Sequence, residues 1–154
     1  MKDSTVSDQV YGMQLMLRLS QIERIDAIDD SARLGEFLVS LVRKIGMTVV
    51  NGPHMASEEG SAQTYGHSAV VILSESHASI HTYPRRGELF LDVFSCRPFD
   101  QSDVMCTCEE FFGRFVVSER TLLDRGYHWH ASASASLSML ADQRKGTDAR
   151  RSGE

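Results

Sequence analysis

The sequence predicts an α+β fold, a two-layer sandwich in which two helices cover one face of a mostly antiparallel sheet. Three observations lead to this prediction: a strand pattern near the N-terminus, two amphipathic helix patterns, and several short strand patterns separated by turn residues. Such a sheet leaves its second face uncovered. We expect a second copy of the chain to cover that face, so that the protein dimerises through the sheet.

The first strand and the first helix have the clearest patterns. From Tyr11 to Leu19 every odd position is apolar, and polar residues stand between them except at Met16. The helix that follows has N-cap oxygens before it, apolar residues three and four positions apart within it, and a glycine after it: Asp29, Asp30 and Ser31; Leu34, Phe37, Leu38, Leu41, Val42 and Ile45; and Gly46.

The rest of the chain predicts further strands and one more helix. Asp100 is placed to cap that helix, whose apolar positions run to Phe115. The expected ranges are a strand at 47–50, a long polar loop at 51–67, strands at 69–73 and up to 83 around a break at 74–76, a turn at 84–87, a strand at 89–96, and short strands at 115–118 and 127–129.

Length and composition indicate one soluble domain. The chain has 154 residues, of which 42% are hydrophobic and 24% are charged, the proportions of a globular protein. We expect this domain to span residues 1–130. From 131 to 154 the residues are small, polar and charged, which predicts a disordered tail.

The charge balance and the cysteines exclude several classes of protein. A formal net charge of -5 argues against a nucleic-acid partner, which would require clustered Lys and Arg. No apolar stretch approaches the roughly 20 residues of a membrane span, and the N-terminus lacks a signal-peptide core, so we expect a cytoplasmic protein with no membrane partner. Cys96, Cys106 and Cys108 are odd in number and unevenly spaced, which favours reduced thiols, and no second ligand pair accompanies the C-x-C pair to form a metal site.

The most informative segment runs from Ser74 to Cys96 and reads SESHASIHTYPRRGELFLDVFSC. It resembles the processing and proton-donor segment of bacterial S-adenosylmethionine decarboxylases, which show Glu-Ser-His, then Ser-Ile-His-Thr-aromatic-Pro, then Asp-Val-Phe and a Cys. The spacing between these elements is preserved here, which makes the match far more specific than a lone short motif. The resemblance covers roughly residues 10–130.

The resemblance implies a self-cleaving, pyruvoyl-dependent decarboxylase of polyamine biosynthesis. The hydroxyl of Ser76 would attack the carbonyl of Glu75 and convert the peptide bond to an ester. Elimination and hydrolysis would then leave a pyruvoyl group at residue 76 and separate residues 1–75 from 76–154. This group would form a Schiff base with the substrate amine and act as the electron sink, with no metal and no pyridoxal phosphate.

The resemblance also assigns roles to individual residues. His81 matches the base that removes the α proton of Ser76, and Ser68 matches a serine that assists processing. Cys96 matches the proton donor for the decarboxylated substrate, a thiol that is still mostly protonated at pH 7. The strand alternation predicts that His77, Ser79, His81 and Tyr83 project to one side of the sheet.

The substrate pocket departs from the family pattern at two positions. The family usually has a Phe that stacks on adenine and a Glu that binds the ribose hydroxyls, where this chain has Ala62 and Arg85. Tyr65 is a substitute for the missing ring, and Tyr83 replaces the usual Trp. We therefore expect Tyr65, His77, Tyr83 and Arg85 to contact the substrate.

These departures leave the reaction intact and leave alternatives for the substrate. S-adenosylmethionine comes first because of the family, and the alternative is decarboxylation of ornithine or arginine by the same pyruvoyl chemistry. A non-catalytic relative that regulates an active partner is a third interpretation. The presence of the four residues that catalysis and processing need speaks against it: Ser68, Ser76, His81 and Cys96.

Overall fold

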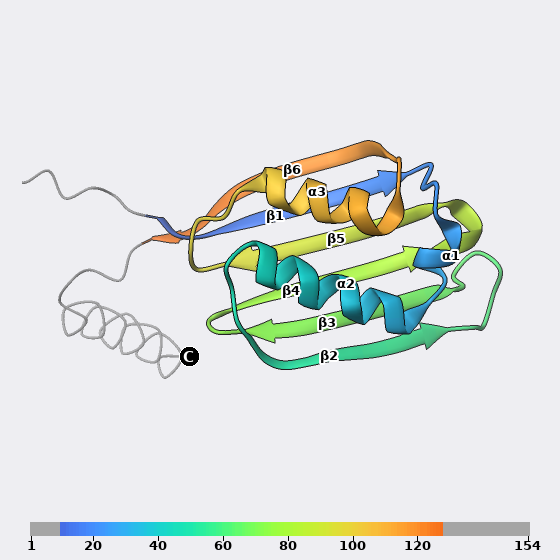
Figure 1. Ribbon diagram of the computed structural model, residues 1–154, viewed down its shortest axis with the longest axis horizontal. Helices are drawn as coiled ribbons and strands as arrows, with labels where there is room; N and C mark the ends of the chain where they lie inside the picture. Colours follow the sequence, from blue (N-terminus) through green and yellow to red (C-terminus); the bar gives the residue numbers. More distant parts are fainter. Residues whose placement is uncertain (1–9, 128–154) are drawn as a thin grey trace, which may run out of the picture. The chain divides into compact units, whose positions relative to one another are not determined.

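The structure, a computed structural model, describes residues 10–127, and residues 12–125 form a compact unit. Its elements, in chain order, are β1 (Val10–Ser20), α1 (Ile25–Ile28), α2 (Ser31–Lys44), β2 (Val49–Glu58), β3 (Gly66–Leu73), β4 (Ser76–Tyr83), a 3-10 turn (Pro84–Arg86), β5 (Glu88–Ser95), α3 (Gln101–Phe112) and β6 (Val116–Tyr127). The strands form one sheet in the order β2-β3-β4-β5-β1-β6. Figure 1 shows α2 and α3 lying on the same face of this sheet.

The sheet is antiparallel, as predicted. β3 pairs with β4, β4 with β5 and β5 with β1 in antiparallel register, and β2 also pairs with β3 antiparallel. β6 lies against β1 in the opposite chain direction, because Arg18 of β1 contacts Glu119 while the earlier residue Gln14 contacts Arg125. The predicted α+β sandwich with its two helices on one face is therefore confirmed.

The core lies between the helices and one face of the sheet. Alternate residues of β1, β3, β4 and β5 point toward α2 and α3 and are buried there: Leu15, Leu17, Leu19, Ala69, Val71, Leu73, Ala78, Ile80, Leu89, Leu91 and Val93. Phe37 of α2 meets Phe112 of α3 with ring centroids 4.7 Å apart. The aromatic contact joins the two helices above the sheet, so one layer of apolar packing supports the whole unit.

Both long helices begin at the caps that the sequence predicts. The Asp30 carboxylate accepts the backbone N–H groups of Ala32 and Arg33, and the Asp100 carboxylate accepts that of Ser102. The hydrogen bond from Ser102 lowers the pKa of Asp100. Gly46, with φ +75°, follows the end of α2 in a conformation that glycine adopts without strain.

Two sequence predictions about strands are wrong. Residues 51–58 of the predicted loop at 51–67 belong to β2, which extends from Val49 to Glu58 at the edge of the sheet. Nearly all of β2 is exposed and its register is irregular near Gly52, so the alternation that marks a half-buried strand is absent. The predicted short strand at 115–118 is the start of a continuous β6 that reaches Tyr127. The predicted segment after 127 and the tail at 131–154 lie outside the described residues.

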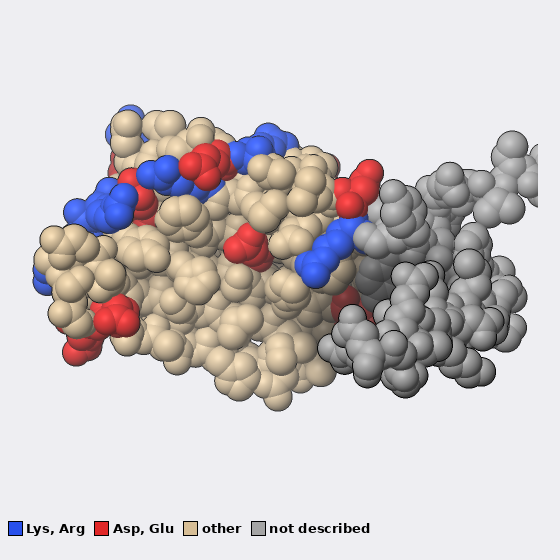
Figure 2. All heavy atoms as spheres, turned by 180° about the vertical axis from the view of Figure 1, so that it is seen from behind, with Lys and Arg blue, Asp and Glu red and all other residues tan. Residues whose placement is uncertain are grey.

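The other face of the sheet, here called the open face, carries no helix of the described unit. It presents alternate residues of the three central strands: Ser68, Val70 and Ile72 of β3, His77, Ser79, His81 and Tyr83 of β4, and Phe90, Asp92 and Phe94 of β5. The predicted shared side of the four β4 residues is confirmed. Seen from behind in Figure 2, this face is largely uncharged over β2 to β4, and charged side chains gather toward β1 and β6.

Within residues 10–127 no helix is long and apolar enough to cross a bilayer. The same residues contain no cluster of three or more metal-ligating His, Cys, Asp or Glu side chains.

Candidate active site

The centre of the candidate site is the tight turn between β3 and β4. Leu73 pairs with Ser76, so Ser74 and Glu75 alone connect the two strands. Glu75 has φ +61°, in the left-handed region, although it is not a glycine. A side chain in this conformation costs about 1 kcal/mol, and Glu75 is the residue whose carbonyl the predicted reaction attacks. The turn therefore holds the Glu75–Ser76 peptide bond between a strained residue and a paired strand.

Ser76 and Cys96 meet at this turn. The backbone N–H of Cys96 donates to Ser76 Oγ at 2.9 Å, and the Cys96 thiol donates to the carbonyl oxygen of Ser74 at 3.7 Å. Ser76 is buried, with 7% of its surface exposed, and Cys96 is half-buried and free of any disulfide. The structure thus brings together the predicted precursor serine and the predicted proton donor, which are 20 positions apart in the chain.

A cavity of about 380 Å³ opens beside this turn. It is lined by Gly46, Met47, Thr48, Val50, Ser74, Glu75, Cys96 and Arg97. Both residues of the turn and the predicted proton donor therefore border a space that a small molecule can enter.

Ser68 and His81 form a second cluster. They occupy paired positions on β3 and β4, and Ser68 Oγ lies 2.8 Å from His81 Nδ1. A hydrogen bond of this length orients the imidazole and leaves its Nε2 available for proton transfer. Both side chains, with Tyr83, line a separate cavity of about 270 Å³.

A single chain does not bring these two clusters together. His81 follows Ser76 by five positions in β4, and with a strand rise of about 3.3 Å per residue their α-carbons are about 16 Å apart. The two side chains also point to opposite faces, since Ser76 alternates with the buried Ala78 and Ile80 while His81 lies on the open face. Within one protomer His81 is therefore too far from Ser76 to take its α proton.

The four predicted substrate-contacting residues lie in three places. Tyr65 and Arg85 stack, with the guanidinium carbon 4.9 Å from the ring centroid. Tyr83 packs edge-on against Phe90 of the open face, with ring centroids 5.9 Å apart. His77 contacts Phe94 of the neighbouring strand, with ring centroids 5.5 Å apart. Ala62 lies in the exposed turn before Tyr65 and presents no ring to a substrate.

The structure adds Asp29 and His67, which the sequence analysis did not select for the site. Asp29, at the C-terminal end of α1, accepts a hydrogen bond from the Tyr65 hydroxyl at 2.7 Å and lies 3.2 Å from His67 Nε2. The hydrogen bond to Asp29 raises the pKa of Tyr65. Asp29 looked in the sequence like one of several cap residues, so no signal distinguished this role from the cap that Asp30 provides.

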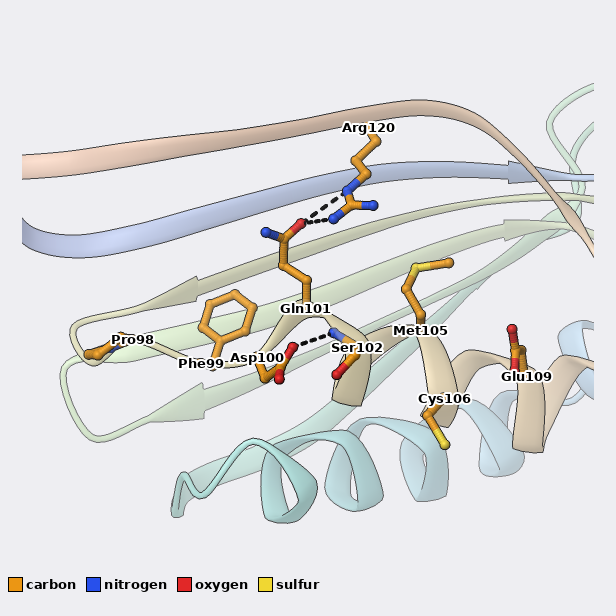
Figure 3. A pocket seen from close by; sticks show the side chains of 9 residues that line it. All are labelled: Pro98, Phe99, Asp100, Gln101, Ser102, Met105, Cys106, Glu109 and Arg120. Atoms are coloured by element: carbon orange, nitrogen blue, oxygen red, sulfur yellow. Dashed lines mark hydrogen bonds between the residues drawn. The ribbon is translucent and has the colours of Figure 1, made fainter.

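A further cavity, of about 900 Å³, contains none of the predicted site residues. Figure 3 shows it between α3 and β6, where Arg120 reaches across to the side-chain carbonyl of Gln101. Cys106 lines this cavity and is exposed, and its hydrogen bond to Glu110 raises its pKa. Cys108 is buried in the core, and burial raises its pKa to about 12, so this thiol is unreactive at neutral pH.

Comparison with known proteins places this geometry in a family. A family model described as S-adenosylmethionine decarboxylase matches residues 14–126. An S-adenosylmethionine decarboxylase proenzyme of Methanococcus maripaludis is 36% identical over 86 residues, which cover 55% of this chain and 65% of that protein. A proenzyme of the same description from Carboxydothermus hydrogenoformans is 31% identical over 100 residues, covering 62% and 73%.

A solved structure shows the same fold. The crystal structure of the adenosylmethionine decarboxylase from Aquifex aeolicus superposes with a TM-score of 0.65 at 24% sequence identity, over 80% of this chain and 98% of that one. The match to the first relatives is partial, since it spans about 65% of their length. The family model nevertheless covers β1 to β6 and both clusters described above, and the chain belongs to the S-adenosylmethionine decarboxylase family.

Proposed function

We propose that this chain is the precursor of a pyruvoyl-dependent enzyme that cleaves itself between Glu75 and Ser76 and then decarboxylates S-adenosylmethionine. The observation that carries the proposal is the turn itself: Glu75 is held at φ +61°, and the Oγ of the next residue is fixed by the backbone of Cys96. A strained peptide beside a positioned hydroxyl is what an intramolecular acyl shift requires.

The cleavage proceeds in three balanced steps. Ser76 Oγ bonds to the carbonyl carbon of Glu75, the peptide C–N bond breaks, and the hydroxyl proton moves to the freed nitrogen. A base then removes the α proton of Ser76, and the Cβ–Oγ bond breaks with its electron pair leaving on Oγ. Water finally replaces the nitrogen, which departs as ammonia, so that residue 76 begins the new chain as a ketone.

The residues around the turn fit the group that this sequence of steps would create. When present, a pyruvoyl group supplies the electron sink for decarboxylation. Cys96 lies beside the same turn, and its thiol carries a proton that it now donates to Ser74. Its role in the proposal is to return that proton to the substrate carbon after carbon dioxide has left.

A second copy of the chain completes the site in this proposal. His81 is about 16 Å from the Ser76 of its own chain, because five residues of β4 separate them. His81 lies on the open face, where Val70 and Ile72 are 39% and 47% exposed and only part of the surface is charged. The proposal requires a copy packed on this face to bring its own Ser68–His81 pair to the first copy's turn.

The family supports S-adenosylmethionine as the substrate rather than ornithine or arginine. The curated relatives are named for that substrate. The retained hydrogen bonds at Ser76 and between Ser68 and His81 support an enzyme over a non-catalytic regulator.

Release of labelled carbon dioxide tests this proposal. The mature protein is incubated in parallel with carboxyl-labelled S-adenosylmethionine, ornithine and arginine, and the Ser76→Ala variant serves as the matched control. We expect release from S-adenosylmethionine alone and none from the variant. Preferential release from ornithine or arginine over S-adenosylmethionine would reject the proposed substrate. No release from any of the three compounds would reject the proposal that the protein is a decarboxylase.

A further inference from the structure

The cavity beside the processing turn is lined by one positively charged side chain that the proposed reaction does not use. Arg97 is the only Lys or Arg among its lining residues, and Glu75 is the only acid. Within residues 10–127 no hydrogen bond or ion pair engages the guanidinium of Arg97 or the carboxylate of Glu75. We propose that Arg97 and the backbone N–H of Cys96 form a binding site for the carboxylate that cleavage creates at Glu75, an inference that rests on the proposed self-cleavage.

The origin of the new carboxylate oxygen locates this site. In the elimination step the Cβ–Oγ bond of Ser76 breaks and Oγ stays bonded to the carbonyl carbon of Glu75. Oγ therefore becomes one of the two oxygens of the new chain end. In the uncleaved chain this same atom accepts the Cys96 N–H at 2.9 Å, so the carboxylate forms with one of its oxygens already hydrogen-bonded.

The net charge of the residues that line the cavity changes when the chain is cleaved. Before cleavage the residues that line the cavity include one acidic side chain, that of Glu75, and one guanidinium, that of Arg97. After cleavage Glu75 carries two carboxylates, because its neutral peptide carbonyl has become a chain terminus. The added negative charge is the reason that Arg97 gains a partner only in the mature protein. A planar guanidinium matches the geometry of a carboxylate and binds it through two parallel hydrogen bonds.

The backbone of Arg97 is held in place for this contact. Its N–H donates to Ser95 Oγ at 3.0 Å, and the same hydroxyl donates to the Arg97 carbonyl at 2.6 Å. Ser95 is fully buried, so this closed pair of hydrogen bonds anchors the chain immediately after Cys96. Arg97 is thus a positioning residue: it holds the new terminus at the cavity wall, against the backbone N–H of Cys96, and keeps it from drifting toward the ketone.

Thermal unfolding of cleaved and uncleavable chains tests the inference. Arg97→Gln and Arg97→Lys are made in the otherwise unaltered chain, which is incubated until cleavage is complete, and in the Ser76→Ala chain. We expect Arg97→Gln to lower the Tm of the cleaved protein by about 3 °C and to leave that of the Ser76→Ala protein within about 1 °C. Arg97→Lys should restore part of the loss, and 1 M NaCl should reduce the difference.

The matched control is Arg43→Gln, which removes an exposed arginine from the last turn of α2, outside the cavity. This control substitution should change the Tm of the cleaved protein and that of the Ser76→Ala protein by the same amount. An equal change in Tm on Arg97→Gln in the cleaved and the Ser76→Ala proteins would overturn the inference. So would a cleaved protein whose Tm Arg97→Gln does not change. An Arg97→Gln chain that never cleaves would also overturn it, because binding a finished carboxylate is not needed to break the bond. A parent chain that stays whole would instead reject the proposed function itself.

Discussion

At the residue scale, the backbone and the side chain of Cys96 have separate tasks. Its N–H holds Ser76 Oγ in the uncleaved chain, and its thiol lies at the cavity beside the turn. A substitution that changes only the side chain keeps the first contact and removes the second. Processing and turnover can therefore be separated by mutation at one position.

We predict that Cys96→Ala still cleaves to a large extent and loses turnover by about 10²- to 10⁴-fold, the usual contribution of a positioned proton donor. The alanine keeps the backbone N–H that holds Ser76 Oγ. Cleavage is measured on a denaturing gel and turnover by carbon dioxide release. Turnover that survives Cys96→Ala at the parent level would remove the thiol from the mechanism. The comparison is Cys108→Ala, at a buried cysteine of α3 that does not line the cavity beside the turn.

The sequence selected the candidate site residues at this scale but not their grouping. The spacing of Ser68, Ser76, His81 and Cys96 was sufficient to select them, because a processing motif is local in the chain. The structure shows that they form two clusters, and that division depends on strand register, which pairs Ser68 with His81 and Leu73 with Ser76. The role of Asp29 depends on a contact across 36 positions, which no local pattern records.

At the scale of elements, one ion pair joins the chain after β1 to the chain after α3. The Glu23 carboxylate accepts the backbone N–H of Arg114 at 2.8 Å and pairs with its guanidinium at 2.9 Å. The backbone hydrogen bond and then the guanidinium lower the pKa of Glu23. A carboxyl whose pKa is lower in the folded protein stabilises it above the ordinary glutamate pKa, and that stabilisation is lost as the pH falls through the folded value.

The Glu23→Gln variant tests this linkage. We predict a lower Tm than the parent at pH 7, because the variant has no charge at this position. The difference should narrow as the pH falls below the ordinary glutamate pKa of about 4.3 and vanish once the parent carboxyl is protonated. Unfolding is followed by circular dichroism from pH 7 to pH 2 in the Ser76→Ala background. A difference that stays constant across this range would show that the ionisation of Glu23 does not stabilise the fold.

Elements with one buried face were predictable from the sequence, and exposed ones were not. β1 and α2 carry periodic apolar residues because one side of each lies in the core, from Leu15 to Leu19 and from Leu34 to Val42. β2 is exposed along most of its length and β6 is exposed from Val116 to Arg125, so their residues are under little pressure to alternate. The four-residue α1 is too short to show a helical period.

At the scale of the whole molecule, the separation of the two clusters makes a specific prediction about the proposed dimer. The Ser76→Ala chain cannot cleave, and the His81→Ala chain lacks the proposed base. If each site combines Ser76 of one copy with His81 of the other, a mixed dimer of these variants contains one complete site.

We therefore predict that co-expression of Ser76→Ala with His81→Ala produces cleavage of the His81→Ala chain, although each variant alone stays whole or nearly so. Size tags of different length identify the cleaved chain on a denaturing gel. Absence of cleavage in verified mixed dimers would contradict a shared site. Full cleavage of His81→Ala alone would contradict the assignment of His81 as the base.

Mass spectrometry of the purified mature protein is the most direct measurement of the central proposal, which is the breaking of the bond between Glu75 and Ser76 by the protein's own hydroxyl. We expect two fragments, one ending at Glu75 with a free carboxyl and one beginning at residue 76 and lighter by one ammonia than a chain that starts with serine. The Ser76→Ala protein should show only the intact chain. An intact parent chain, or a fragment that begins with an unmodified serine, would contradict the account.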